Sequence, residues 1–236
     1  MLILDIETYK TTDESLISYI IAGKKRADYK ESAINKLATN PHTGQVLLVG
    51  MLTDHEPIAI QGVLWGQHNH PEGDDAIEQT VMNQATIGLN GISERDVLNA
   101  TWKIIAEELD NGGQIITYRG KAFDIPYLIK RSMILNVDPA NRRGGSGIYY
   151  PYDLIKKYDQ AAHLDLYDKL NPNYGEHTSL DMWAYIMGIS PNINDEGGEK
   201  VGEWFEAGDF DKIREHCSMD IWKTFYIYER MKPWLT

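Results

Sequence analysis

Four carboxylates from three distant parts of the chain are the side chains best suited to chemistry. They are Asp5, Glu7, Asp124 and Asp220. The first pair directly follows a short apolar run at the N-terminus, and the last lies four residues after His216. Carboxylates gathered from separate segments make sense if the fold places them around divalent metal ions. Such a set of residues is typical of a metal-dependent nuclease.

Asp5 and Glu7 stand two residues apart, so a β-strand would present both side chains on the same face. Two carboxylates on one face repel each other unless a positive charge lies between them. Hard oxygen ligands favour Mg²⁺ or Mn²⁺, whose remaining coordination positions are filled by water and substrate phosphate. The alternative is an ordinary strand end that meets solvent, and Asp-x-Glu by itself does not separate the two.

His216 and Asp220 are spaced i, i+4 and would share one face of a C-terminal helix. The same face carries residues that favour the protein interior, namely Ile213, Cys217, Ile221 and Thr224. A buried aspartate is costly unless it is paired or bound to metal, and a histidine one turn earlier could act as a general base. A simple His–Asp hydrogen-bonded pair is the alternative.

Asp124 follows a predicted strand and precedes a predicted helix, within the segment Phe-Asp-Ile-Pro. In this position it could serve as a helix N-cap, which typically stabilises a helix by about 1 kcal/mol. An N-cap side chain can also point into a site, so the structural and the chemical interpretation are compatible.

Hydrophobic patterning predicts an α/β fold with a mixed sheet flanked by helices. Strands are expected at residues 2–5, 45–52, 57–65 and 114–118, the second and third as a hairpin. Helices are expected within residues 11–40, from Ser93 to the glycines at 112–113, and at 125–135, 179–188 and 209–231. Ser-Glu-Arg-Asp from Ser93 fits the capping-box pattern, and residues 66–91 are expected to form a loop. Because no linker-like segment divides the chain, we expect one domain over residues 1–236.

The composition is that of a globular protein, with 236 residues, 42% apolar residues, 25% charged residues and a net charge of −12. This acidity argues against non-specific duplex binding through a broad basic surface, although bound metal ions would reverse the sign of an acidic site. No apolar run approaches the roughly 20 residues that span a bilayer, and Asp5 interrupts the N-terminal run too early for a signal peptide. With Cys217 as the single cysteine, we expect a soluble protein of the reducing cytoplasm.

In order and spacing, Asp-x-Glu, Phe-Asp-x-Pro-x-Leu and His-x-x-x-Asp resemble the three motifs of the DEDD 3′–5′ exonucleases. The second of these, from Phe123 to Leu128, is a specific match, as is the Ser-Leu-Asp that opens a helix at Ser179. The segment 163–166 resembles one that these enzymes carry ahead of that helix, and implies a supporting strand or contact. The chain looks most similar to the predicted exonucleases related to the proofreading domain of family B DNA polymerases. The resemblance implies a ribonuclease H-like fold, two divalent metal ions (Mg²⁺ or Mn²⁺) and hydrolysis from a 3′ end.

The same resemblance implies a role for each residue of the site. Asp5, Glu7 and Asp220 would hold the ion that activates water. Asp5, helped by Asp124, would hold the second ion. His216 would orient and deprotonate the attacking water. The DEDD exonucleases that this chain otherwise resembles carry tyrosine at the position of His216, four residues before the last aspartate. In the other subgroup, which carries histidine, one more residue separates the histidine from that aspartate.

Three further residues are expected to bind the substrate. Thr8 would contact the terminal nucleotide through its backbone or hydroxyl, and Phe123 would contact it by stacking, unless Phe123 belongs to the core. The related enzymes carry Asn-Gly before the second motif, where this chain has Arg119-Gly120. Arg119 would then bind a phosphate in place of the missing amide, or point to solvent.

The leading hypothesis is a stand-alone exonuclease that acts on single-stranded DNA ends, with a replication or repair partner left open. An exoribonuclease of the same fold is the alternative within this class, because no residue pattern that reads a 2′-hydroxyl is recognisable. A non-catalytic module that binds nucleic acid or a partner protein is the alternative outside it. The four carboxylates argue against such a module, because buried acids without partners destabilise a fold.

Overall fold

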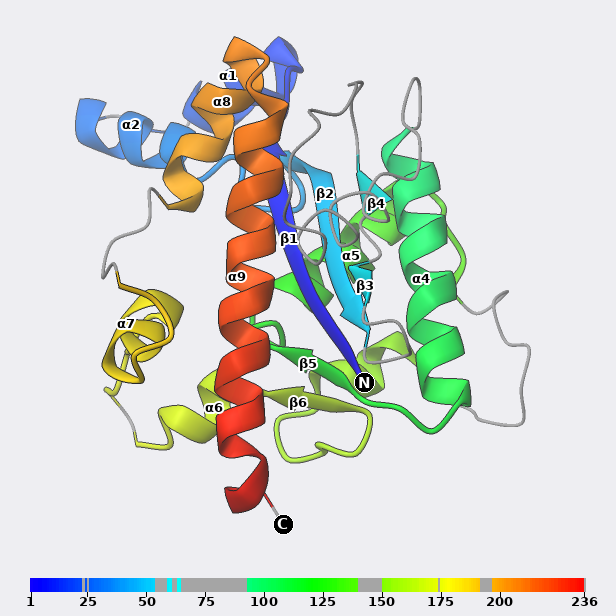
Figure 1. Ribbon diagram of the computed structural model, residues 1–236. Helices are drawn as coiled ribbons and strands as arrows, with labels where there is room; N and C mark the ends of the chain where they lie inside the picture. The colour runs from blue at the N-terminus through cyan, green and yellow to red at the C-terminus, as the bar shows by residue number, and fades with distance from the viewer. Residues whose placement is uncertain are drawn as a thin grey trace.

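In the part of the chain that the computed structural model describes, six strands form one mixed sheet (Figure 1). They are β1 (Leu2–Lys10), β2 (Gly44–Thr53), β3 (Ala59–Ile60), β4 (Val63–Leu64), β5 (Ile115–Thr117) and β6 (His163–Asp165). Their order is β3-β2-β1-β5-β6, with β4 also paired to β2. β1 is antiparallel to β2 and parallel to β5, and β5 is parallel to β6. The structure describes residues 1–22, 24, 26–53, 59–60, 63–64, 93–139, 150–173, 175–191 and 197–235.

The strand predictions are confirmed wherever the structure describes the chain. β1 is longer than expected, because it stays paired with β2 up to Lys10 across a bulge between Glu7 and Thr8. Within the predicted strand 57–65, both β3 and β4 pair antiparallel with β2, as a hairpin requires. The predicted loop at residues 66–91 lies outside the described residues.

Eight α-helices occur in the described part of the chain. They are α1 (Glu14–Ala22), α2 (Ala27–Asn35), α4 (Glu94–Asp110), α5 (Asp124–Ile134), α6 (Leu166–Leu170), α7 (Leu180–Ile186), α8 (Val201–Ala207) and α9 (Phe210–Met231). The sequence pattern missed α6 and α8, which are too short for a helical period to show. All the other helices overlap a predicted one.

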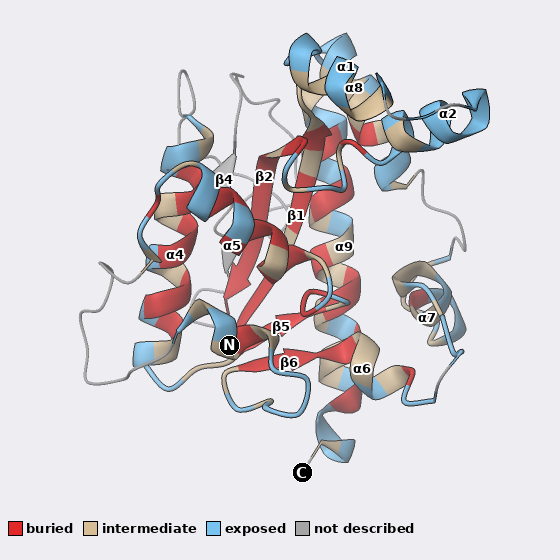
Figure 2. Cartoon of the chain, turned by 180° about the vertical axis from the view of Figure 1, so that it is seen from behind, coloured by how far each residue is buried: buried red, intermediate tan, exposed pale blue. Residues whose placement is uncertain are grey.

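Helices cover both faces of the sheet, with α9 on one face and α4 and α5 on the other (Figures 1 and 2). Alternation along β1 sends Leu2, Leu4 and Ile6 into the core beneath α4 and α5. Ile3 and Tyr9 face the opposite way, into the core beneath α9. The central strand is therefore buried on both sides, as the red strands of Figure 2 show.

The start of α4 follows the capping-box prediction. The Ser93 hydroxyl accepts a hydrogen bond from the Asp96 backbone N–H, and the Asp96 carboxylate accepts one from the Ser93 N–H. The apolar face of α4 is buried at Val97, Trp102 and Ile105. The prediction of Asp124 as an N-cap is wrong, because Phe123 occupies the cap position and Asp124 is the first residue of α5.

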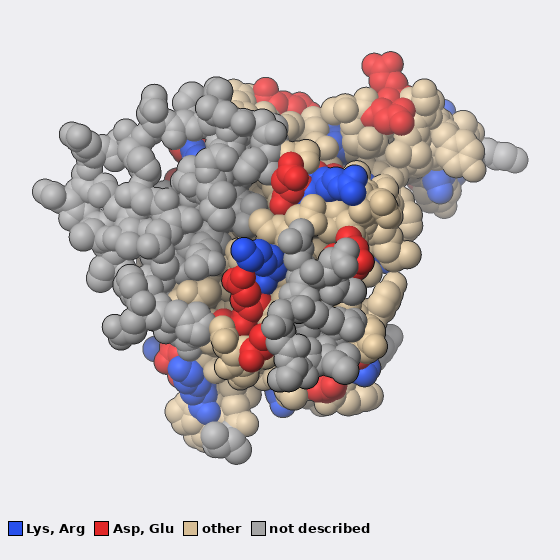
Figure 3. All heavy atoms as spheres, turned by 90° about the vertical axis from the view of Figure 1, so that its right-hand side faces the viewer, with Lys and Arg blue, Asp and Glu red and all other residues tan. Residues whose placement is uncertain are grey.

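The described surface carries both signs of charge. On the face shown in Figure 3, Lys and Arg side chains lie beside Asp and Glu side chains and do not gather into one basic patch. This mixture agrees with the net charge of −12. Among the described helices, none combines the length and apolar character needed to cross a membrane.

Candidate active site

β1 directs two carboxylates towards α9. Asp5 and Glu7 have the same parity as Ile3 and Tyr9, so they emerge on the α9 face, where apolar side chains would otherwise continue the core. Across the ladder they stand opposite Gly50 and Leu48 of β2. The prediction that both side chains share one face is thus confirmed, and this face is buried under a helix.

A glycine of β2 lets α9 come close to these carboxylates. A Cβ at Gly50 would lie 2.5 Å from the Cys217 sulfur and at least as close to the Ile221 Cδ1. Such distances are far below van der Waals contact, so any other residue would force the Cys217 and Ile221 side chains, or α9 itself, to move. Sequence reasoning missed this residue, although a glycine inside an otherwise apolar strand is a recognised sign of close backbone approach.

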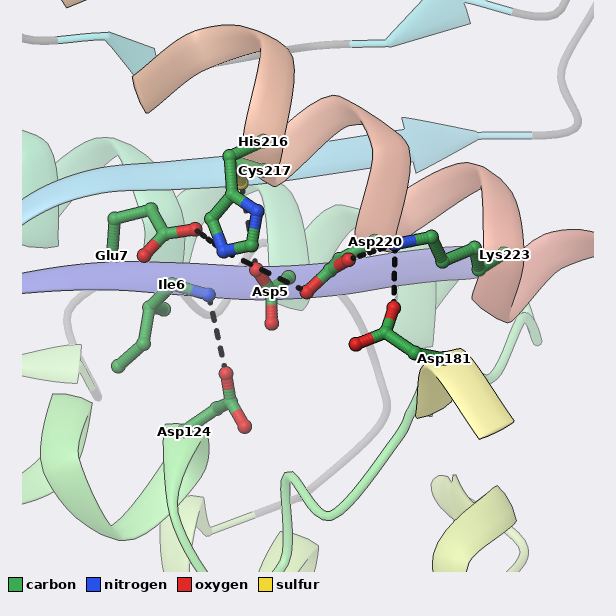
Figure 4. A network of polar contacts seen from close by, with 9 residues as sticks. All are labelled: Asp5, Ile6, Glu7, Asp124, Asp181, His216, Cys217, Asp220 and Lys223. Carbon is green, nitrogen blue, oxygen red and sulfur yellow. Dashed lines mark hydrogen bonds and ion pairs between the residues drawn. The ribbon is translucent and has the colours of Figure 1, made fainter. Parts of the chain in front are cut away.

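α9 contributes three polar side chains to the same space, and they converge on β1 in Figure 4. The Nε2 atom of His216 lies 3.7 Å from the Glu7 Oε1 and 4.0 Å from the Asp220 Oδ2. The Cys217 thiol donates to the Asp5 Oδ2 at 3.5 Å. The predicted inward face of α9 is confirmed, because His216 and Cys217 are buried.

The fourth carboxylate comes from the start of α5. β5 pairs with β1 only at Leu2 and Ile3, which leaves the next backbone donors on that edge of β1 without a strand partner. The Asp124 Oδ1 accepts a hydrogen bond from the Ile6 N–H at 3.2 Å (Figure 4). Asp124 is therefore fixed beside Asp5 by the backbone of the strand that carries Asp5.

Burial raises the pKa of all four carboxyl groups above their ordinary values. For Asp5, the negative charges of Asp124, Glu7 and Asp220 raise the pKa further. The pKa of Asp124 is raised to about 7, mainly by burial, while hydrogen bonds from backbone N–H groups oppose the rise. For Asp220, the positive charge of Lys223 opposes the effect of burial. Ionisation of all four carboxyl groups would therefore place more negative charge in the site than its protein surroundings stabilise.

Lys223 is a site residue that sequence reasoning missed. Its ammonium donates to the Asp220 Oδ1 at 3.0 Å and to the Asp181 Oδ1 at 2.7 Å. Its side chain is only 3% exposed, and this ion pair links α9 to the first turn of α7. A lysine three residues after a motif aspartate, on an otherwise buried helix face, is the signal that could have identified it.

The donor set fits a divalent metal ion. Within the described residues, Asp5, Glu7 and Asp124 form no ion pair with a lysine or arginine. Ligand atoms of Asp5, Glu7 and Cys217 all lie within 4.8 Å of one another. A divalent cation would offset the mutual repulsion of these buried carboxylates, as hard oxygen donors favour.

A cleft of about 710 Å³ opens beside the carboxylates. Its lining includes Asp5, Asp124 and Asp220, as well as Arg119 and Phe123 from the loop before α5. The remaining lining residues are Ile6, Thr39, Tyr118, Ala122, Tyr167, His177, Thr178, Ser179 and Leu180. The fold thus brings two of the three predicted substrate-binding residues, Arg119 and Phe123, to the cleft beside the carboxylates.

The third of these residues, Thr8, has a different placement. Its side chain lies near the hydroxyl of Tyr127 on α5, which donates to the Ala38 carbonyl oxygen at 2.8 Å, and it is not among the described residues that line the cleft. Phe123 was expected either to contact the nucleotide or to belong to the core, and its position allows both. It is among the residues that line the cleft, and its ring centroid lies 5.5 Å from that of Tyr127 at the edge of the core.

Asp165, at the end of β6, holds the loop that presents Arg119 and Phe123. Its carboxylate accepts hydrogen bonds from the backbone N–H groups of Arg119 at 2.7 Å, Lys121 at 2.9 Å and Tyr167 at 3.0 Å. The supporting strand and contact expected at residues 163–166 are both present. With three backbone donors bound to one buried carboxylate, Asp165 fixes the conformation of the loop that forms this wall of the cleft.

We expect Asp165→Ala to lower both stability and any activity of the site, because it leaves three backbone donors without their acceptor. A loss of roughly 2 kcal/mol corresponds to a fall in melting temperature of about 4–8 °C. Thermal denaturation checks this, with Asp168→Ala in the neighbouring helix α6 as the matched control. Equal melting temperatures for the two variants would contradict the role given to Asp165.

A family model for predicted 3′-5′ exonucleases related to the exonuclease domain of PolB matches residues 68–234, more than half of the chain. The chain belongs to this family. The match contains Asp124, His216 and Asp220 of the site, while Asp5 and Glu7 lie before it. A search among curated proteins found no match.

The family B DNA polymerase from the hyperthermophilic archaeon Pyrobaculum calidifontis has a similar structure, with a TM-score of 0.59 at 18% identity. The similarity covers 98% of this chain and 24% of the polymerase, so the chain corresponds to about a quarter of that protein. At this level of identity the likeness concerns the fold. It confirms the expected ribonuclease H-like arrangement, a mixed sheet flanked by helices.

Proposed function

We propose that this protein is a metal-dependent 3′–5′ exonuclease that hydrolyses single-stranded DNA ends with two divalent ions, Mg²⁺ or Mn²⁺. The observation that carries the proposal is the convergence of Asp5, Glu7, Asp124 and Asp220, from three elements, beside one open cleft. Membership of the exonuclease family supports the reaction type. A protein that only binds nucleic acid gains nothing from four mutually repelling carboxylates.

In this proposal the carboxylates hold the metal ions, and each has its own place. Asp5, Glu7 and Asp220 would hold one ion, and Asp5 with Asp124 would hold the other. When bound, the ions would stabilise the attacking and the leaving oxygen of an in-line displacement at phosphorus. The hydrogen bond from the Ile6 N–H positions the Asp124 carboxylate beside Asp5. The ammonium of Lys223 positions the Asp220 carboxylate by donating a hydrogen bond to it.

His216 is proposed to orient the attacking water and to accept its proton. Its Nε2 faces Glu7 and Asp220, which are two of the carboxylates assigned to one ion. The indole of Trp204 packs against the imidazole, with ring centroids 5.9 Å apart and ring planes at 64°. This packing limits rotation of the ring and supports a fixed direction for proton transfer.

A single strand is the proposed substrate because of the shape and lining of the cleft. Tyr118, Phe123 and Tyr167 lie along its wall together with Arg119. Aromatic rings beside a cation suit unpaired bases and their phosphates, and they do so with little regard to sequence. We also propose that residues 1–236 act as one domain, because β1 and α9, from the two ends of the chain, both contribute to the same site.

The direct test is digestion of matched DNA and RNA oligonucleotides, labelled at the 5′ end, with Mn²⁺, Mg²⁺ or EDTA. We expect a metal-dependent ladder that shortens from the 3′ end, with DNA degraded faster than RNA. Faster loss of RNA would assign the exoribonuclease alternative. No digestion of either substrate by correctly folded, metal-loaded protein would contradict the proposal.

For His216→Gln we expect turnover to fall by about a hundredfold or more, since general-base assistance is typically worth that much. His216→Tyr should recover part of the loss, because a tyrosine hydroxyl can still orient a water molecule. Initial rates on the preferred oligonucleotide measure both. A near-wild-type rate for His216→Gln would remove the histidine from the proposed role.

A further inference from the structure

Arg119 presents a free positive charge to the cleft. Its side chain is exposed, and among the described residues no carboxylate forms an ion pair with its guanidinium. The carbon at the centre of the guanidinium lies 5.2 Å from the centre of the Tyr167 ring. An arginine held over an aromatic face keeps its donors in a fixed plane, which suits recognition of a phosphate.

The backbone at Arg119 is held in a conformation that arginine rarely adopts. Its φ angle is +69°, in the left-handed region that glycine and asparagine tolerate best. Two hydrogen bonds to Asp165, one from Arg119 itself and one from Lys121, keep the loop in this conformation. Strained residues of this kind are concentrated at functional sites, and here the strain aims the side chain along the cleft wall.

Tyr167 and His177 extend the surface on which the guanidinium lies. Their ring planes differ by 15° with centroids 6.5 Å apart, and the Tyr167 hydroxyl is hydrogen-bonded to the His177 Nδ1 at 2.6 Å. A short bond between the edges of two nearly parallel rings means that they lie side by side in nearly one plane. The pair forms a flat, polar-edged surface in the wall of the cleft.

The carboxylates and this surface share one cleft but have different chemistry. Metal ions at Asp5, Asp124 and Asp220 would take the phosphate that is cleaved, and Arg119 is not needed there. A 3′-terminal nucleotide has no phosphate beyond the scissile one, so any second phosphate belongs to the strand on the 5′ side. The phosphate available to the Arg119 guanidinium is therefore the next one along the strand, on the 5′ side of the scissile phosphate.

We propose that Arg119, held over the Tyr167–His177 ring pair, binds the phosphate on the 5′ side of the scissile bond. This inference rests on the proposed exonuclease function and specifies how the strand lies in the cleft. The site would then contact at least two consecutive phosphates of the substrate strand. A substrate with a single phosphodiester would gain nothing from Arg119.

The test compares Arg119→Asn with the wild type on two substrates in Mn²⁺. Asparagine removes the charge and fits the left-handed backbone, so the variant should fold at least as well as the wild type. On a single-stranded oligonucleotide we expect KM to rise about tenfold with little change in kcat. On the 4-nitrophenyl ester of thymidine 5′-phosphate, which has one phosphodiester, we expect no change. Lys130→Ala, at an exposed position of α5 outside the cleft lining, is the control.

Salt dependence supplies a second readout that a purely structural change would not move. Loss of one phosphate contact should lower the slope of log(kcat/KM) against log[salt] by about 0.7 for a single strand. Arg119→Lys should retain the wild-type slope, because it keeps the charge, although it loses the planar stacking on Tyr167.

Two results would overturn the proposal. An unchanged KM and salt slope for Arg119→Asn on the oligonucleotide would show that Arg119 binds no phosphate. An equal loss on the oligonucleotide and the ester would place Arg119 at the scissile phosphate. Failure of the exonuclease proposal is separate, since the wild type would then hydrolyse neither substrate.

Discussion

Asp124→Asn is expected to abolish turnover and to stabilise the metal-free protein. The asparagine carbonyl can still accept the hydrogen bond from the Ile6 N–H, so the local fold should persist. What disappears is one negative charge beside Asp5. We expect the rate on a 3′ single-stranded end to fall by a hundredfold to a thousandfold or more, by analogy with losses on removing one stabilising group from a reacting centre.

The stability change follows from the raised pKa of Asp124, about 7 in the folded protein against an ordinary value of 3.8. Between these values the unfolded chain has lost the proton that the folded chain still binds, so the free energy of unfolding falls as pH rises. Above about pH 7 the folded protein has also lost this proton, and it then bears the full free-energy cost of a buried, ionised Asp124. In EDTA at pH 8, Asp124→Asn avoids it, and we expect a gain on the order of 2 kcal/mol, or about 4–8 °C.

Thermal denaturation in EDTA between pH 5 and 8 measures this gain. The wild type should lose stability relative to Asp124→Asn as pH rises through that range. Glu31→Gln, which changes an exposed carboxyl of α2, controls for the general loss of one negative charge. A variant that melts below the wild type at pH 8 would show that Asp124 stabilises the apo fold, which is the opposite of what its surroundings predict.

Mn²⁺ is expected to raise the melting temperature strongly, because a cation at Asp5 and Glu7 offsets repulsion that the apo protein bears. At a concentration one hundred times the dissociation constant, binding to the folded state contributes about 2.7 kcal/mol, which corresponds to roughly 5–11 °C. EDTA should reverse the shift. The proposed ions thus act on folding as well as on catalysis.

Asp5→Asn should remove most of this shift, since Asp5 is the carboxylate proposed to touch both ions. Glu31→Gln, at an exposed position of α2, should retain it and serves as the control. A shift of equal size in Asp5→Asn would place the metal elsewhere. The measurement needs no substrate, so it separates metal binding from nuclease activity.

Much of the site could be predicted because its geometry is local. The shared face of Asp5 and Glu7 follows from the two-residue period of a strand, and that of His216 and Asp220 from the helical turn. The α4 capping box is equally local, because Ser93 and Asp96 satisfy each other's backbone donors. Such features depend on neighbours within four residues, and the sequence contains those neighbours.

Other features depend on which segments meet. The N-cap expected at Asp124 was wrong, because β5 leaves β1 after Ile3 and the freed Ile6 N–H attracts the carboxylate instead. Short helices such as α6 and α8 gain their stability from packing and have too few residues to show a pattern. Thr8 was expected at the substrate, but its side chain lies near Tyr127 of α5 and is not among the described residues that line the cleft.

By itself, the sequence determined the residue types of the site, the strand and helix that carry them, and the fold class, because periodicity and motif order are written along the chain. Only the tertiary structure decided how closely these elements meet. Gly50 sets the approach of α9 to β1, Lys223 ties Asp220 to α7, and Asp165 aims the Arg119 loop into the cleft. These contacts join residues tens to more than a hundred positions apart, and packing in three dimensions selects them.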